Sequence, residues 1–133
     1  MSSELIRRAV AARDRAIAPY SQFKVGAAIE TRTGEIFTGC NIENASYGLT
    51  VCAERVALWK ALSEGATNFG RLAVAVDAPT LAAPCGSCRQ LLWEYCGDIE
   101  IVMCSVRGDQ KSFKLSELLP EPFDQRSLGN SPK

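Results

Sequence analysis

Histidine is absent from this chain of 133 residues. Without an imidazole, the sequence excludes a Ser-His-Asp triad, a Cys-His catalytic pair and every metal site that uses histidine ligands. Acid–base chemistry near neutral pH must therefore use an Asp, Glu, Lys, Tyr or Cys side chain with a shifted pKa, or a bound ion. The search for functional residues narrows to the carboxylates and to the six cysteines.

Net charge and long apolar segments are missing too. The 15 Lys and Arg residues balance the 15 Asp and Glu residues, which argues against a protein whose main work is to grip nucleic acid or an anionic membrane. No apolar run approaches the ~20 residues that span a bilayer. Residues 1–20 carry charge too often to form a signal peptide. We therefore expect a cytoplasmic protein with reduced thiols.

The length fits a single domain that spans residues 1–133, in which the Pro-, Gly- and Ser-rich end, about 124–133, is expected to be a flexible tail. The local patterns predict the order of the secondary structure elements. Helices are expected before Pro19 and at 52–63, 85–95 and 116–119, and strands at 23–30, 35–38, 72–76, 99–104 and 111–115.

Two of these strands define the fold class. Strands 72–76 and 99–104 are apolar except at Glu100 and are separated by a helix, so parallel pairing through a right-handed crossover is expected. Strands 23–30 and 35–38 flank a turn at Thr33-Gly34 and read as a hairpin. The sequence thus predicts an α/β protein with a three-layer α/β/α fold and a mixed sheet of about five strands.

Two cysteines stand one helical turn apart in residues 84–88, PCGSC. The proline and the helix that follows place Cys85 and Cys88 in the first helical turn, where the helix dipole and free N–H groups stabilise thiolates. Such a pair forms either a redox centre or half of a metal site. Because the chain has no histidine, the remaining ligands of a metal site have to be cysteines or carboxylates.

Cys52 is the best candidate for a third ligand. It stands at the expected start of helix 52–63, with Thr50 as the candidate N-cap. Three thiolates around Zn²⁺ leave the fourth tetrahedral position to water, which is the arrangement of a catalytic zinc site.

A closed four-thiolate site is the alternative, and Cys40 is the main rival as its fourth ligand. Cys96 lies roughly 12 Å from Cys88 along the helix, at 1.5 Å per residue. Cys104 ends an apolar strand and is expected to be an inert core residue.

Two charged residues follow Cys52. Glu54 lies two residues later and is the candidate proton shuttle of a histidine-free site; a glutamate placed there only for the helix dipole is the alternative. Arg55 is the candidate for tuning the charge of the zinc site, because three thiolates leave zinc with a net charge of −1 and hydrogen bonds to sulfur reduce it. A solvated helix arginine is the alternative.

These residues resemble the zinc-dependent cytidine deaminases, in particular the small homotetrameric members with three cysteine ligands. That class combines a His or Cys ligand, a glutamate two residues on and a later PCxxC motif. The matching segments, which span roughly residues 4–123, are CAER at 52–55, PCGSCRQ at 84–90, YSQFKVGAA at 20–28, GCNIENA at 39–45 and LLPEPF at 118–123.

The resemblance implies a role for each site residue. One zinc ion per subunit is expected, and neighbouring subunits of a homotetramer complete each site. The implied zinc ligands are Cys52, Cys85 and Cys88, the proton shuttle is Glu54, and the nucleoside contacts are Phe23, Asn41, Glu43, Ala53 and, from an adjacent subunit, Tyr47 and Phe123. Asn41 and Glu43 are implied to bind the ribose, and the alternative for both is turn chemistry. The alternative for Phe23 is an ordinary position in the hydrophobic core.

The implied reaction is hydrolytic deamination of free cytidine and 2′-deoxycytidine to the uridines, a step of pyrimidine salvage. Zinc-bound hydroxide attacks C4, Glu54 protonates the ring nitrogen and then the departing amine, and ammonia leaves. Two alternatives stay open. One changes the substrate to a polynucleotide or a nucleoside antibiotic, and the other is a non-catalytic binding module with a closed zinc site. Neither nucleic acid nor a membrane is an expected partner.

Overall fold

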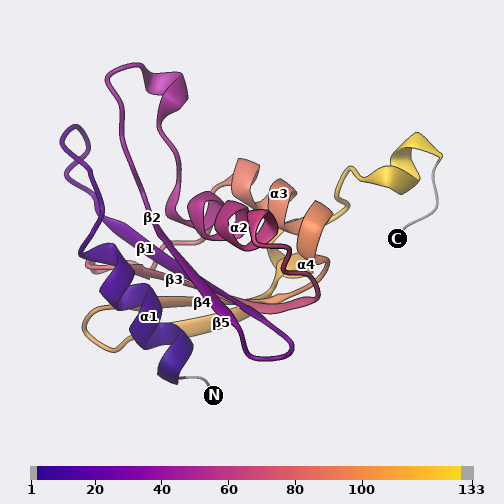
Figure 1. The fold of residues 1–133 in the computed structure, drawn as a ribbon, viewed down its shortest axis with the longest axis horizontal. Helices are drawn as coiled ribbons and strands as arrows, with labels where there is room; N and C mark the ends of the chain where they lie inside the picture. Colours follow the sequence, from indigo (N-terminus) through magenta and orange to yellow (C-terminus); the bar gives the residue numbers. More distant parts are fainter. Residues whose placement is uncertain (1–2, 130–133) are drawn as a thin grey trace.

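The computed structural model describes residues 3–129, which fold around one five-stranded mixed sheet (Figure 1). The strands lie in the order β2-β1-β3-β4-β5. Only β3 and β4 are paired in parallel, and the other neighbours are antiparallel. In chain order the elements are α1 (Ser3–Arg13), β1 (Val25–Thr31), β2 (Ile36–Cys40), the 3₁₀ helix η1 (Tyr47–Leu49), α2 (Ala53–Ser63), β3 (Phe69–Val76), α3 (Gly86–Cys96), β4 (Glu100–Ser105), β5 (Gln110–Lys114), α4 (Leu115–Leu118) and the 3₁₀ helix η2 (Gln125–Leu128).

The sheet has a helical layer on each face, as the α/β/α prediction requires. α1 lies on one face, and α2 and α3 lie on the other (Figure 1). On the α1 face, Leu5 and Ala9 pack with Ala28 and Ala73 of the central strands. The larger core lies under α2 and α3 and includes the fully buried Phe69. Within residues 3–129, no helix is long and apolar enough to cross a membrane.

The predicted elements are present, and some of their boundaries differ. α1 ends at Arg13, well before Pro19, because the next residues form tight turns with i→i−3 hydrogen bonds, such as that from Asp14 N to Ala11 O at 3.2 Å. β3 begins at Phe69, three residues before the predicted start. Gly70 interrupts the apolar pattern there, so the sequence pattern does not indicate the first three residues of the strand.

The expectation that Thr50 caps the second helix is wrong. Cys52 is the N-cap of α2, and Thr50 lies two residues too early because the chain between them is extended and paired with Ile42. The Thr50 hydroxyl instead accepts a hydrogen bond from the backbone N–H of Asn44 at 3.0 Å.

Gly39 allows α2 to lie directly against β2. A Cβ atom at this position would stand 2.5 Å from both the Ala53 carbonyl oxygen and the Ala57 nitrogen, which are backbone atoms of α2. We expect Gly39→Ala to destabilise the fold by about 1–3 kcal/mol, because the helix must shift to admit the methyl group. Denaturant unfolding measures the change. Gly48→Ala is the matched control, since a Cβ there meets nothing within 4 Å; equal stability of the two variants contradicts close packing at Gly39.

Candidate active site

Three cysteines from two helix starts meet at one point. Cys52 is the N-cap of α2, Cys85 is the N-cap of α3, and Cys88 lies in the first turn of α3. Their Sγ atoms lie within 4.8 Å of one another, and those of Cys52 and Cys85 are 3.9 Å apart. Two sulfurs bound to one tetrahedral zinc at ~2.3 Å lie about 3.8 Å apart. The donor atoms and their spacing therefore fit zinc, and we call these residues the three-cysteine cluster.

Both helix starts present their sulfurs without using them as caps. Cys52 and Cys85 have extended backbones, and neither side chain makes a capping hydrogen bond. The positive ends of two helix dipoles therefore point at the cluster, where they stabilise thiolates. Helix α3 follows the loop after β3, and α2 follows the loop after β2. The cluster thus forms where the starts of two helices meet, one following the carboxyl end of β2 and the other that of β3.

The thiols of the cluster do not titrate alike. The hydrogen bond with the Cys88 thiol lowers the pKa of Cys52 to about 6, and Cys85 and the positive charge of Arg55 act in the same direction. The pairing with Cys52, together with burial, raises the pKa of Cys88. Of these two thiols, Cys52 is therefore the one that favours the thiolate in the metal-free chain, and metal binding displaces the proton of Cys88.

No fourth cysteine joins the cluster. Among residues 3–129, the three-cysteine cluster is the only group of three or more cysteine or carboxylate side chains placed to share a metal ion. Cys104 is 1% exposed, and its thiol lies 3.4 Å from the Val74 carbonyl oxygen, so its predicted place in the core is confirmed. Cys40 ends β2, and Cys96 ends α3. The arrangement is the open one, with three ligands, and not the closed four-thiolate alternative.

Glu54 lies beside the cluster in the first turn of α2. The residue is 5% exposed, and among the described residues it is the only buried one with a charged side chain. Burial is the main reason that its pKa is raised to about 7 in the metal-free chain, and the charge on Cys52 acts in the same direction. A buried carboxyl at this position can exchange protons with a molecule held at the cluster.

Arg55 is not simply a solvated arginine on the helix surface. Its guanidinium lies over the Trp59 ring, 5.7 Å from the centroid, and its Nε is buried without a hydrogen-bond partner among the described residues. Its positive charge helps to lower the pKa of Cys52. Hydrogen bonds from Arg55 to the zinc-site sulfurs stay a prediction.

A small ladder outside the main sheet joins two distant loops to the cluster. Ile42 pairs with Ile17 in parallel on one side and with Val51 in antiparallel fashion on the other. Val51 directly precedes Cys52, the first cysteine of the cluster, so the ladder connects the segment of Asn41 and Glu43, the neighbours of Ile42, to the chain that enters the cluster. The sequence assigns no role to Val51, because a single bridge between loops leaves no periodic pattern.

Asn41 is a structural brace in this chain. Its side-chain amide donates to the Phe23 carbonyl oxygen and accepts from the Val25 N–H, both at 2.8 Å. The residue is 8% exposed. These bonds hold the entry to β1 and so determine where Phe23 lies.

Glu43 braces the other predicted substrate loop. One carboxylate oxygen accepts from the backbone N–H groups of Tyr20 and Ser21, both at 3.0 Å, and the other accepts from the Ser21 hydroxyl. These bonds, led by that of the Ser21 hydroxyl, lower the pKa of Glu43. All of these bonds reach residues more than 20 positions away in the chain, so they are not the local turn chemistry considered as the alternative. Ribose binding by Glu43 stays a prediction.

The predicted aromatic contacts are open to solvent. Phe23 is 43% exposed, Tyr47 89% and Phe123 61%, whereas Ala53 is fully buried at the start of α2. η1, which contains Tyr47, stands at the top of the domain in Figure 1, and the segment after α4, which contains Phe123, extends to the right, away from η1. One chain therefore does not bring Tyr47 and Phe123 together at its own cluster.

A cavity of about 680 Å³ lies away from the cluster, between the ends of α2 and α3 and the C-terminal segment. Phe69, Trp93 and Asp124 are among its lining residues. None of the site residues predicted from the sequence lines it, so this cavity is not the predicted nucleoside pocket.

Comparison with known proteins places the chain in a family. Residues 1–105 match the family model described as the cytidine and deoxycytidylate deaminase zinc-binding region. The chain belongs to this deaminase family. It is thus a zinc-dependent hydrolytic deaminase, and the three-cysteine cluster is the group that fits its ion.

Relatives of this deaminase match it over nearly its whole length. A cytidine deaminase of Halalkalibacterium halodurans is 45% identical over 127 residues, which is 95% of this chain and 96% of the relative. The crystal structure of a cytidine deaminase from Burkholderia pseudomallei has a TM-score of 0.88 at 46% identity and covers 92% of this chain and 100% of its own. A blasticidin-S deaminase of Bacillus cereus is 37% identical over 105 residues, 72% of this chain and 74% of the relative.

Proposed function

We propose that this chain deaminates free cytidine and 2′-deoxycytidine hydrolytically, converting each with one water molecule to the corresponding uridine and ammonia. The observation that carries the proposal is the buried Glu54 carboxyl beside the open three-cysteine cluster. A carboxyl that is excluded from solvent and faces an open metal position has the chemistry of a proton shuttle for hydrolysis. The relatives named cytidine deaminase support the choice of substrate.

Cys52, Cys85 and Cys88 would hold the zinc ion, which would supply a Lewis acid that acidifies water. Glu54 takes one proton from the attacking water and delivers it to the pyrimidine ring nitrogen. It then takes the second proton of that water, from the hydroxyl now on C4, and delivers it to the departing amine, so that the C4 carbonyl forms and ammonia leaves. Its burial keeps bulk water from competing as the proton donor. Arg55 helps to keep the Cys52 sulfur deprotonated through its charge.

The nucleoside is held at the ladder. Asn41 and Glu43 each keep hydrogen-bonding capacity beyond their bonds to the backbone, since an amide has two donors and a carboxylate about four acceptor positions. They bind the ribose hydroxyls, and a substrate without the sugar leaves these groups unpaired. Phe23 packs against the nucleoside and the Ala53 backbone meets the pyrimidine edge.

The pocket is completed by neighbouring subunits of a homotetramer. Tyr47 and Phe123 are large aromatic side chains with 89% and 61% exposure, and exposed aromatics of this size are typical of interfaces. Because their segments project from the body of the domain and lie apart from each other (Figure 1), each side chain is open to a site on an adjacent subunit. The six free cysteines support a reducing compartment such as the cytoplasm.

The first test is an assay of purified, zinc-loaded protein with cytidine. We expect the ultraviolet absorbance to change as uridine forms, with ammonia released in equal amount. Protein stripped of zinc with a chelator is the control and is expected to be inactive. Cytosine, which lacks the ribose, is expected to react at least about 100-fold more slowly, because buried polar groups at the ladder lose their partners. Sedimentation of the same sample reports whether four chains associate.

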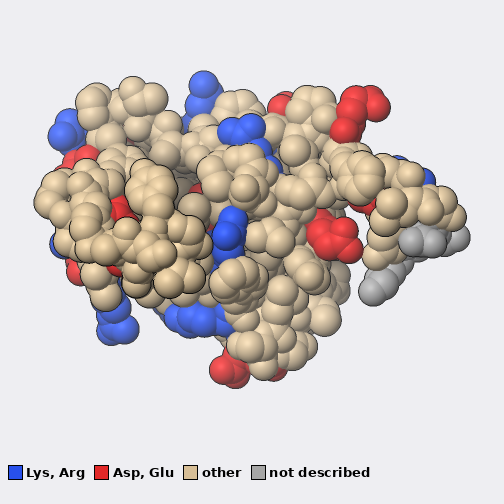
Figure 2. All heavy atoms as spheres, turned by 90° about the horizontal axis from the view of Figure 1, so that it is seen from above, with Lys and Arg blue, Asp and Glu red and all other residues tan. Residues whose placement is uncertain are grey.

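An absence of turnover with zinc bound contradicts the proposal and turns attention to the other substrates. The relative named blasticidin-S deaminase makes a nucleoside antibiotic the next one to assay. A polynucleotide is disfavoured, because acidic and basic side chains are interspersed on the face shown in Figure 2, without a continuous basic tract.

A further inference from the structure

Helix α3 carries two sets of residues with different partners. Its start supplies Cys85 and Cys88 to the cluster. Further along, four side chains bond the last residue of α4 and the segment that follows it. These bonds join Arg89 Nη1 to the Leu118 carbonyl at 2.8 Å, Gln90 Nε2 to the Phe123 carbonyl at 2.6 Å, Trp93 Nε1 to Asp124 Oδ2 at 3.0 Å, and Glu94 Oε2 to Gln125 Nε2 at 3.3 Å.

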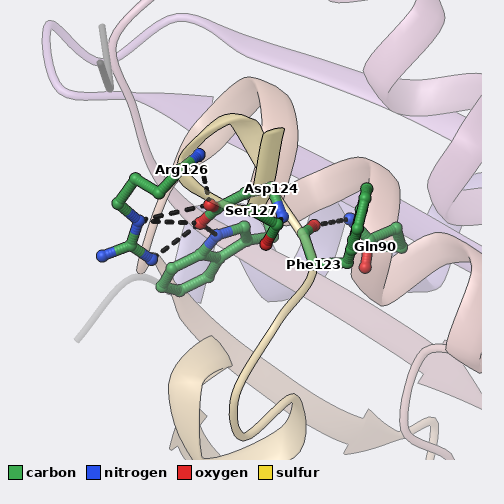
Figure 3. A network of polar contacts seen from close by, with 6 residues as sticks. Gln90, Phe123, Asp124, Arg126 and Ser127 are labelled. Atoms are coloured by element: carbon green, nitrogen blue, oxygen red, sulfur yellow. Dashed lines mark hydrogen bonds and ion pairs between the residues drawn. The ribbon is translucent and has the colours of Figure 1, made fainter. Parts of the chain in front are cut away.

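Asp124 is the junction of this contact (Figure 3). Its carboxylate accepts from the Trp93 indole, from the Arg126 guanidinium at 2.7 Å and from the Arg126 backbone N–H at 2.9 Å. The side chain is only 13% exposed. The last of these bonds also caps η2. The first residue after Phe123 is thereby fixed to α3 and to the short helix that follows.

The ring of Phe123 has no comparable attachment. It is 61% exposed, while its own carbonyl is held by Gln90 and the next residue is held by Trp93. Trp93 is itself packed against the main core, so it is a firm support. The direction of the Phe123 side chain is therefore set by backbone attachments to α3 and not by packing of the ring within its own chain.

We propose that Trp93 and Gln90 are positioning residues: they fix the C-terminal segment so that Phe123 is presented, pre-ordered, to the nucleoside pocket of a neighbouring subunit. This inference rests on the proposed function, in which Phe123 completes an adjacent site. A segment that is already ordered loses less conformational entropy when substrate binds. Helix α3 thus supplies ligands to the zinc site of its own subunit and positions an aromatic side chain for the site of a neighbouring subunit.

A double-mutant cycle on cytidine turnover tests the proposal. Trp93→Phe removes the indole donor and retains an aromatic ring in the core, and Phe123→Ala removes the positioned ring. We expect Trp93→Phe to raise KM about fivefold, as for the loss of one hydrogen bond, with kcat within about twofold. In the Phe123→Ala background the same change is expected to leave KM unaltered, because the positioned group is gone. Gln90→Met, which is similar in size, repeats the test without touching the core.

Tyr95→Phe is the matched control, since it removes a hydroxyl from an exposed aromatic residue of the same helix and is expected to change neither constant. A rise in KM that is equal in both backgrounds shows a general structural effect and overturns the inference, as does an unchanged KM in Trp93→Phe. An unchanged KM in Phe123→Ala overturns both the shared pocket and the inference, while wild-type turnover of cytidine keeps the deaminase function standing.

Amide hydrogen exchange measures how firmly the C-terminal segment is attached to α3, independently of enzyme activity. The Arg126 N–H is bonded to Asp124, and we expect it to exchange faster in Trp93→Phe than in the wild type or in Tyr95→Phe. Equal exchange in all three proteins contradicts the positioning role. If the wild type fails to deaminate cytidine, the proposed function fails, and this measurement still decides whether Trp93 orders the segment.

Discussion

Replacing Glu54 with Gln is expected to lower the turnover of cytidine about 1000-fold while one zinc ion per subunit stays bound. Positioned acid–base groups contribute about 10²–10⁴-fold to such reactions, and Glu54 is the one carboxyl that is buried next to the cluster among the described residues. Glutamine has nearly the same shape, so the start of α2 and the packing around it are retained. It cannot accept a proton from water or deliver one to the departing amine.

The measurement combines steady-state kinetics with the zinc content of the same sample. Glu64→Gln is the matched control, because Glu64 is an exposed glutamate at the other end of α2, and wild-type kinetics are expected. A Glu54→Gln variant that keeps its zinc and turns over cytidine at more than a tenth of the wild-type rate removes Glu54 from the mechanism. Loss of zinc in that variant instead assigns the residue to the metal site.

The cluster could be predicted from the sequence because its chemistry restricts residue types. With no histidine present, only cysteines and carboxylates could bind a metal, and Cys85 and Cys88 share a helical turn. The central strands were predictable for a similar reason, since β3 and β4 are almost entirely apolar. In both cases the information is local, and the fold brings the local pieces together.

The loop ladder could not be predicted, because its bonds depend on residues far apart in the chain. Nothing near Ile42 shows that Ile17 and Val51 lie on its two sides. The bond between Trp93 and Asp124 spans 31 residues and joins a helix to a segment that looks like a loose end in the sequence. Gly39 is similar. The sequence around it does not show that a side chain would clash there, because the clash is with α2, which packs on it only in the folded chain.

Replacing Cys88 with Ser is expected to remove zinc from the protein and to abolish deamination. Cys88 is 1% exposed and is the only buried member of the three-cysteine cluster, so water cannot readily replace its thiolate. Hydroxyl is a poor ligand for zinc compared with thiolate, and we expect zinc affinity to fall more than about 100-fold, beyond the usual effect of losing an outer hydrogen-bond partner. Dialysis against a weak chelator followed by metal analysis measures the loss.

Cys40→Ser is the matched control for this experiment, and it decides between an open and a closed zinc site. Cys40 ends β2 and lies outside the three-cysteine cluster, so this variant is expected to keep one zinc ion and its activity. Loss of zinc in Cys40→Ser gives the site a fourth thiolate, and a site closed in that way has no position left for water. Retention of zinc in Cys40→Ser and its loss in Cys88→Ser leave the fourth position free, which hydrolysis next to Glu54 requires.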